Sequence, residues 1–180
     1  MEILVISDKD SKTALSLGFT NKLVPMLSSE GHDVITVEAS KADILPCTGC
    51  LYCLKQSSGD CRVKDMMAEI NPKIKKAGLI IYLGPIMFGQ YSSTMKNILD
   101  KSRLRRINAV PHMIAVGYGD DLSAEEISTF LDIIRIHRGD SELIHPLFKE
   151  RFEAFVIVKS GDNPNICEEI ISLVGKGGRP

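Results

Sequence analysis

The stretch that decides the fold is LIIYLGPIMFGQYSSTMKNILD, residues 79–100. It begins with a continuous apolar run from Leu79 to Leu83, passes through a turn that contains proline and glycine, and enters a segment of helical period at Met95 to Leu104. A short run that is apolar throughout is typical of a strand covered on both faces of a sheet. The order of strand, turn and helix therefore predicts one unit of an α/β fold.

The same alternation of strands and helices recurs along the chain. Further strands are predicted from the apolar runs at residues 3–6, 34–37, 113–116 and 155–158. Helices between them are predicted from the periodic segments at 14–27 and 66–74. Five parallel strands joined by right-handed crossovers form a three-layer α/β sandwich, and the simplest strand order is the flavodoxin-like 2-1-3-4-5. We predict one flavodoxin-like domain over residues 1–180, with a cysteine-rich insertion at about 46–64.

Composition narrows the classes of partner. The chain of 180 residues has a 44% hydrophobic content, which is enough for a substantial core. The 22 basic and 23 acidic residues leave a formal net charge of -1, which predicts no nucleic-acid partner. No apolar stretch approaches the roughly 20 residues that a membrane-spanning helix needs. We therefore expect a cytoplasmic protein with no nucleic-acid or membrane partner.

Four of the five cysteines lie in the run PCTGCLYCLKQSSGDC, as Cys47, Cys50, Cys53 and Cys61. Three thiols at intervals of three residues can converge from one loop, and a fourth can complete a tetrahedral set. Four thiolates suit an iron-sulfur cluster and a zinc ion equally by ligand count. Reduced or partly disulfide-bonded thiols without a metal are the third interpretation. The fifth, Cys167, is expected to be a small core residue.

The loop after the first predicted strand has the sequence SDKDSKT, residues 7–13. In a doubly wound sheet, ligands bind at the carboxyl ends of the strands beside the switch point. A phosphate at the N-terminus of the following helix could be held by hydroxyls and lysines of this loop, those of Ser7, Ser11, Thr13, Lys9 and Lys12. Ordinary helix capping by Asp10 or Ser11 explains the loop equally well. Asp8 and Asp10 oppose a bound anion, and the loop contains no glycine.

The loops after the third and fourth predicted strands are rich in glycine. In GPIMFGQYSS, residues 84–93, the side chains of Met87, Phe88 and Tyr91 offer flat or polarizable surface to a planar ring. The alternative is a turn with hydrophobic side chains packed beneath it. After the fourth strand, GYGDD at residues 117–121 could approach a cofactor or serve only as a sharp connection.

Taken together, the hydroxyl-rich loop, CTGCLYCLKQSSGDCRVKDMM and GPIMFGQYSSTMKNILD resemble the NADPH-dependent FMN reductase superfamily of flavodoxin-like proteins. Within that superfamily the chain is most similar to the iron-sulfur flavoproteins. The resemblance covers about residues 1–104, and the cysteine segment with its trailing KDMM is its most specific part.

The resemblance implies a role for each motif. FMN phosphate binding falls to Ser7, Ser11, Lys12 and Thr13. The cradle of the isoalloxazine ring falls to Pro85, Ile86, Met87, Phe88 and Gly89, with Gly117, Tyr118 and Gly119 near the other side of the ring. By the same resemblance, Cys47, Cys50, Cys53 and Cys61 are expected to bind a [4Fe-4S] cluster. Such proteins are homodimers or homotetramers in which a neighbouring subunit helps to complete the flavin site.

We therefore expect an FMN-dependent oxidoreductase that passes electrons between NAD(P)H or a redox protein, FMN and a small acceptor or another redox protein. A cluster beside the flavin would mediate one-electron steps. No side-chain set for acid, base or nucleophilic catalysis is expected, since flavin chemistry needs little beyond orientation of the ring. One alternative is a non-enzymatic metal-thiolate or redox-responsive module that has lost FMN, which Asp8, Asp10 and Met87 favour. Another is a flavin reductase whose cysteines are incidental.

Overall fold

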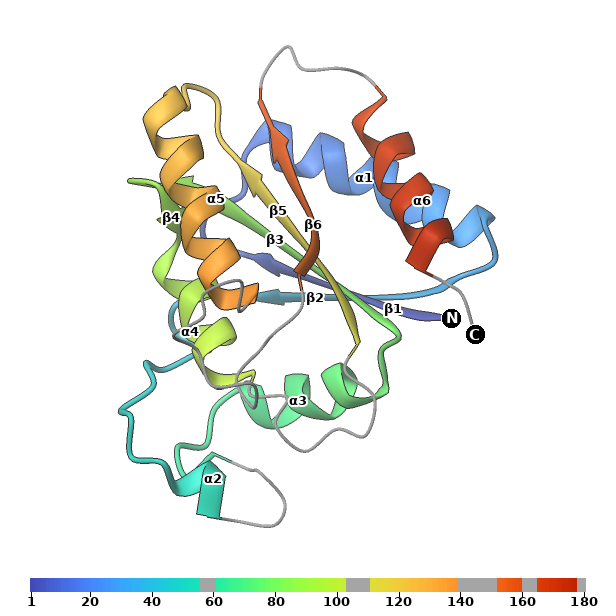
Figure 1. The fold of residues 1–180 in the computed structure, drawn as a ribbon. Coiled ribbons are helices and arrows are strands. Elements are labelled where there is room, and N and C mark those ends of the chain that lie inside the picture. The colour runs from blue at the N-terminus through green and yellow to red at the C-terminus, as the bar shows by residue number, and fades with distance from the viewer. Residues whose placement is uncertain (56–60, 103–110, 139–151, 160–164, 178–180) are drawn as a thin grey trace.

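The computed structural model describes residues 1–55, 61–102, 111–138, 152–159 and 165–177 (Figure 1). Its parallel strands lie in the order β2-β1-β3-β5-β6. Their bounds are β1 (Glu2–Asp8), β2 (Asp33–Ala39), β3 (Leu79–Met87), β5 (His112–Tyr118) and β6 (Phe152–Val158). This order confirms the predicted flavodoxin-like arrangement. Leu104, at which the third predicted helix was expected to end, lies outside the described residues.

Helices cover both faces of the sheet, which confirms the three layers (Figure 1). One face carries α1 (Ala14–Ser29) and α6 (Ile166–Gly177). The other carries α3 (Met67–Lys76), α4 (Ser93–Lys101) and α5 (Ala124–Arg138), and a short α2 (Tyr52–Lys55) lies within the cysteine segment. Among the residues that the structure describes, no helix has the length and apolar character that a membrane crossing requires.

The core lies on both sides of the central strands. In β1 the four residues from Ile3 to Ile6 are at most 2% exposed. Ile3 and Val5 belong to the cluster that α1 and α6 cover, while Leu4 and Ile6 belong to the cluster on the opposite face. Side chains alternate between the faces of a strand, so an apolar residue at every position is what burial on both faces requires.

The second strand departs from the prediction. Residues 34–37 were expected to be covered on both faces, but in β2 only Val37 and Ala39 are buried, and Thr36 is exposed. The reason is its position at one edge of the sheet, where β2 pairs with β1. A continuous apolar run does not by itself distinguish an edge strand from a central one.

A short antiparallel strand was not expected from the sequence. β4 (Gln90–Tyr91) folds back on the end of β3, with Ile86 opposite Tyr91 and Met87 opposite Gln90. The loop after the third parallel strand is therefore a tight hairpin, and α4 begins directly after it.

Candidate functional site

The segments predicted to bind the cofactor meet at the carboxyl edge of the sheet. Ser7 of β1 lies opposite Leu83 of β3, and Pro85 lies opposite Tyr118 of β5. The loop after β1, the β3–β4 hairpin and the turn after β5 consequently follow three neighbouring strand ends. The structure brings the predicted phosphate and ring residues to one edge, and their roles in binding remain predictions.

A buried carboxylate lies at the centre of the loop after β1. Asp8 is only 1% exposed. Its Oδ1 accepts a hydrogen bond from the Asp10 backbone N–H at 2.9 Å, and its Oδ2 accepts one from the Ser11 hydroxyl at 3.2 Å. The Ser92 hydroxyl also donates to Oδ2, although Ser92 is 84 positions away in the sequence. Asp8 thereby ties the loop to the N-terminus of α4.

Two other predicted phosphate ligands, Lys12 and Thr13, also have partners within the chain. The Lys12 ammonium lies 2.6 Å from the Glu38 carboxylate of β2. Thr13 is the N-cap of α1, where its hydroxyl accepts a hydrogen bond from the Ser16 backbone N–H at 3.1 Å. Ser7 is the half-buried penultimate residue of β1. Capping was predicted for Asp10 or Ser11, but the N-cap of α1 is Thr13, and the Asp10 backbone N–H and the Ser11 hydroxyl bind Asp8 instead.

The β3–β4 hairpin presents two large apolar side chains to solvent. Both central residues of its turn have positive φ, 51° at Phe88 and 74° at Gly89, which is the backbone that a two-residue hairpin of matching twist requires. Phe88 is 87% exposed and Met87 is 47% exposed. Ile86, by contrast, is 6% exposed and belongs to the core. The surface available to a planar ring is thus that of Met87 and Phe88.

The hairpin tip is held against α5. A Cβ atom at Gly89 would come within 2.7 Å of the Thr129 Cβ atom. Hydrogen bonds from the backbone N–H and hydroxyl of Ser123, and from the backbone N–H of Phe88, hold the pKa of the Glu126 carboxyl below its usual range. The tip is therefore fixed by packing and by a hydrogen bond to a helix.

The end of β5 and the turn after it make close packing contacts. A Cβ atom at Gly117 would lie 2.6 Å from the Ile86 Cδ1 atom, so the glycine makes room for the strand beneath the hairpin. A Cβ atom at Gly119 would lie 2.7 Å from the Leu122 Cδ2 atom. Tyr118 is buried and its hydroxyl donates to the Ser11 carbonyl oxygen at 2.8 Å. Tyr118 therefore supports the loop after β1 from below.

Replacing Tyr118 with phenylalanine is expected to lower the free energy of unfolding by about 0.5 to 1.5 kcal/mol near neutral pH, because one hydrogen bond is lost. Burial raises the pKa of Tyr118 to about 12 from an ordinary value of 10.0. Between pH 10 and about pH 12 the Tyr118 hydroxyl is ionised in the unfolded state but still protonated in the folded state. The free energy of unfolding therefore falls as pH rises through this range. Urea unfolding from pH 9 to 12 should show a shallower decline for the variant, and identical slopes would contradict this account.

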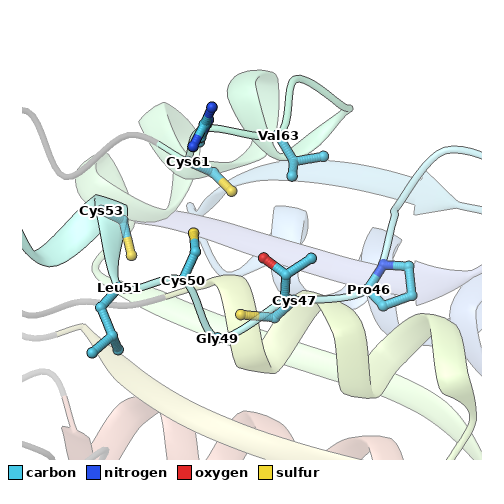
Figure 2. A pocket seen from close by; sticks show the side chains of 10 residues that line it. Pro46, Cys47, Gly49, Cys50, Leu51, Cys53, Cys61 and Val63 are labelled. Carbon is cyan, nitrogen blue, oxygen red and sulfur yellow. The ribbon is translucent and has the colours of Figure 1, made fainter.

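The four clustered cysteines line one pocket on the segment between β2 and α3 (Figure 2). Their sulfur atoms face a common space in Figure 2. Positive φ at Gly49 (66°) and Leu51 (57°) turns the backbone between the first three cysteines. Cys47 and Cys50 are exposed, and Cys53 and Cys61 are half-buried. Among the described residues, no group of three or more His, Cys, Asp or Glu side chains is arranged to hold a metal ion.

Local hydrogen bonds favour the thiolate form of one of these cysteines. The backbone N–H of Tyr52 and the hydroxyl of Thr48, with a smaller effect of the Arg62 charge, lower the pKa of Cys50 below its ordinary value. Cys167 differs from Cys50 in exposure and in pKa. It is buried on α6, and burial raises its pKa. The thiolate is the form that binds metal.

Leu45, Asp65 and Lys101 form a neck at the base of the cysteine segment. The Lys101 ammonium pairs with the Asp65 carboxylate, and the two side chains are only 2% and 4% exposed. Lys101 also donates to the Leu45 carbonyl oxygen at 3.1 Å, while Asp65 accepts from the Leu45 backbone N–H at 3.0 Å. Both ends of the segment are thereby fixed to the last residue of α4.

The sequence interpretation missed the two buried polar clusters, Asp8 with Ser92 and Lys101 with Asp65. Each pair joins positions that are distant in the chain, by 84 and 36 residues. The only signal available was chemical, since a buried carboxylate needs donors and Asp8 follows an apolar strand directly. That signal does not identify the partner.

The hairpin, the cysteine segment and the loop after β1 differ in how well they fit the implied cofactors. Met87 and Phe88 fit a planar ring, because their side chains are exposed at the tip of a fixed hairpin. Four thiols around one pocket match the donor set of a [4Fe-4S] cluster by residue type, although their present arrangement is not that of a metal site. The loop after β1 does not fit a phosphate, because the buried Asp8 carboxylate already takes the hydroxyl of Ser11 in the loop and that of Ser92 beside it.

Sequence comparison places the chain among flavoproteins. The profile of the NADPH-dependent FMN reductase family matches residues 1–137. An iron-sulfur flavoprotein of Methanocaldococcus jannaschii is 27% identical over 139 residues, which cover 72% of this chain and 71% of that protein. An iron-sulfur flavoprotein of Archaeoglobus fulgidus is 33% identical over 118 residues, and the alignment covers 58% of each chain.

Solved structures show the same fold. The FMN-dependent NADH-azoreductase of Bacillus anthracis, in complex with FMN, superposes with a TM-score of 0.63 at 11% identity, covering 99% of this chain and 100% of that one. Megasphaera elsdenii flavodoxin gives a TM-score of 0.59 at 13% identity, covering 98% and 99% of the two chains. With the family profile matched over most of its length, the chain belongs to the NADPH-dependent FMN reductase family and has the flavodoxin-like fold.

Proposed function

We propose that this chain is a flavin-dependent oxidoreductase of the FMN reductase type that exchanges electrons between a flavin at the β3–β4 hairpin and a [4Fe-4S] cluster on Cys47, Cys50, Cys53 and Cys61. One observation carries the proposal. A helix of nine residues, α4, begins beside the exposed hairpin and ends at the neck that fixes the cysteine segment. The two candidate cofactor sites are therefore attached to opposite ends of one rigid element.

The hairpin would orient the flavin ring. Phe88 and Met87 present apolar surface to it, and the contact of Gly89 with α5 keeps the tip in place. A bound flavin supplies hydride acceptance together with one-electron exit, so the side chains need only hold and tune it. The expected donor is NAD(P)H or a redox protein, and the expected acceptor is a small molecule or another redox protein.

The cysteine segment would hold the cluster. Its first three thiols come from residues 47–53, and the fourth, Cys61, comes from the irregular stretch that leads to α3. The lowered pKa of Cys50 favours the thiolate that iron binds. At 1.5 Å per residue, the nine residues of α4 span about 13 Å, which sets the scale of separation between hairpin and neck.

A second copy of the chain is the expected partner at the flavin. An aromatic ring that is 87% exposed and held at positive φ is unusual on an isolated surface. We propose that a neighbouring subunit in a homodimer or homotetramer covers Phe88 and completes the site. Sedimentation of the flavin-loaded protein tests this point, and a monomer with full activity would reject it.

Replacing Cys50 with serine is expected to remove most of the bound iron while leaving the sheet folded. Cys50 is exposed and outside the core, so the loss of its thiol leaves the packing of the strands unchanged. Iron and acid-labile sulfide per chain should be measured after anaerobic reconstitution, with circular dichroism as the check on folding.

The matched control is Cys167→Ala, which removes a thiol on the opposite side of the sheet. It is expected to keep the iron and sulfide content of the wild type, although the cavity it leaves lowers stability. Equal iron in the wild type and in Cys50→Ser would remove Cys50 from the proposed ligand set.

The activity is tested by anaerobic titration of the flavin-loaded protein with NADPH and with NADH. Bleaching of the flavin absorbance by either nucleotide supports the reductase. Ferricyanide, a one-electron acceptor, should then be reduced more slowly by Cys50→Ser than by the wild type, while reduction of a quinone by two electrons should be similar in both. No bleaching by either nucleotide would leave only a redox protein as the donor.

A second candidate function is a non-enzymatic metal-thiolate or redox-responsive module that has lost its flavin. The observation that favours it is the loop after β1, where Asp8 is buried among the hydroxyls and Lys12 is paired with Glu38. Flavin binding distinguishes the two candidates. A metal-thiolate module binds metal through its cysteines but binds no flavin at any concentration.

A further inference from the structure

Asp8 is a buried charged group that the proposed chemistry does not use. Its carboxylate accepts hydrogen bonds from the Asp10 backbone N–H, the Ser11 hydroxyl and the Ser92 hydroxyl. The donors come from two different loops, one after β1 and one before α4. Three donors that converge on one point describe an anion position, and here a side chain of the protein occupies it.

The position lies between two helix N-termini. Ser11 is two residues before Thr13, the N-cap of α1, and Ser92 is itself the N-cap of α4. Helix N-termini carry partial positive charge and favour anions, including the phosphate of a nucleotide in doubly wound folds. β1 and β3 end beside this point, at the place where a mononucleotide binds in a sheet of this order.

Two further groups of the loop are already engaged within the chain. Lys12 is paired with Glu38 at 2.6 Å, and the Thr13 hydroxyl caps α1. The formal charges of the loop cancel, since Asp8 and Asp10 offset its two lysines. A phosphate dianion placed at these N-termini would meet a desolvated carboxylate with no surplus of positive charge from the loop.

We propose that Asp8 is a specificity-determining residue: its carboxylate takes the place of the flavin phosphate, and the chain selects riboflavin over FMN. The inference rests on the proposed function, because it concerns which flavin occupies that site. The isoalloxazine ring and ribityl chain are common to both flavins, so the hairpin treats them alike. Only the phosphate meets Asp8, and only FMN carries it.

The test compares dissociation constants for riboflavin and FMN, measured by quenching of flavin fluorescence, in the wild type and in Asp8→Asn. The wild type is expected to bind riboflavin at least as tightly as FMN. Asparagine keeps the size of the side chain and an oxygen acceptor but removes the charge. It should tighten FMN binding by about tenfold or more, and change riboflavin binding by less than about threefold.

The matched control is Glu30→Gln, which makes the same change in net charge at the C-cap of α1. The 16 residues of α1 place this side chain about 24 Å from the loop, which is well beyond the Debye length at physiological salt. The ratio of the two constants should match that of the wild type.

The outcomes separate the two proposals. A wild type that prefers FMN by about tenfold or more overturns the assignment of Asp8, and this result needs no variant to fold. An equal ratio in the wild type and in Asp8→Asn overturns it as well, while binding of both flavins leaves the oxidoreductase proposal standing. If neither flavin binds the wild type or the variants, the proposed function fails and the selectivity fails with it.

Discussion

Replacing Lys101 with methionine is expected to lower the free energy of unfolding by about 3 to 5 kcal/mol, because the variant leaves the Asp65 carboxylate buried without its cation. The two side chains are 2% and 4% exposed, so water cannot replace the lost partner. Methionine retains the length and apolar stem of lysine. Thermal unfolding should show a decrease in Tm of roughly 6 to 20 °C. Bound iron should also decrease, since the neck at Leu45 and Asp65 loosens.

Lys96→Met on the same helix is the control for this prediction. Lys96 pairs with Asp100 one turn away, but these side chains are 49% and 33% exposed. Pairs of this kind contribute about 0.3 to 0.5 kcal/mol, so the control should unfold near the wild-type temperature. The double variant Lys101→Met with Asp65→Asn should recover part of the loss, because the unpaired buried charge is gone. If Lys101→Met and Lys96→Met lower the free energy of unfolding by similarly small amounts, the neck does not hold the cysteine segment.

Replacing Gly89 with alanine is expected to lower the free energy of unfolding by about 2 to 4 kcal/mol. Part of the loss is the left-handed backbone at φ 74°, which an alanine adopts at a cost of about 1 to 2 kcal/mol. The rest comes from overpacking, because the new Cβ atom would lie 2.7 Å from the Thr129 Cβ atom. Flavin affinity should fall as well, since the tip that carries Phe88 must move away from α5.

Gly31→Ala separates the two causes. Gly31 also has positive φ, at 80°, but no atom lies within 4 Å of the position that a Cβ would take. This control should lose only the backbone part, about 1 to 2 kcal/mol, and should bind flavin as the wild type does. Chemical denaturation of the two variants measures the difference. Equal losses at both glycines would show that the hairpin is not packed on α5.

The central strands could be predicted from the sequence because burial on both faces leaves one pattern, a short run that is apolar at every position. The run at β1 shows it, with all four residues from Ile3 to Ile6 buried. The edge strand β2 was not distinguished from the central ones, because Thr36 is the only polar residue in its run at 34–37, although β2 lies at the end of the strand order. β4 was missed because two residues are too few for any period.

The candidate site could be predicted only as far as local sequence reaches. The hairpin loop and the cysteine spacing are local, and the hairpin follows a strand end at which the predicted topology puts ligands. The loop after β1 was open to two interpretations, because the hydroxyls that suit a phosphate also suit helix capping. Which interpretation applies depends on Ser92 and Glu38. These residues approach Asp8 and Lys12 only in the folded chain. Such pairings carry no signal in one sequence.

The most direct test of the account is the absorption spectrum of protein purified anaerobically and supplied with flavin, iron and sulfide, with the bound amounts of each, and of zinc, determined on the same sample. The account predicts about one flavin, four iron and four sulfide per chain. Bound zinc without sulfide, or a chain that retains neither flavin nor iron, would contradict it.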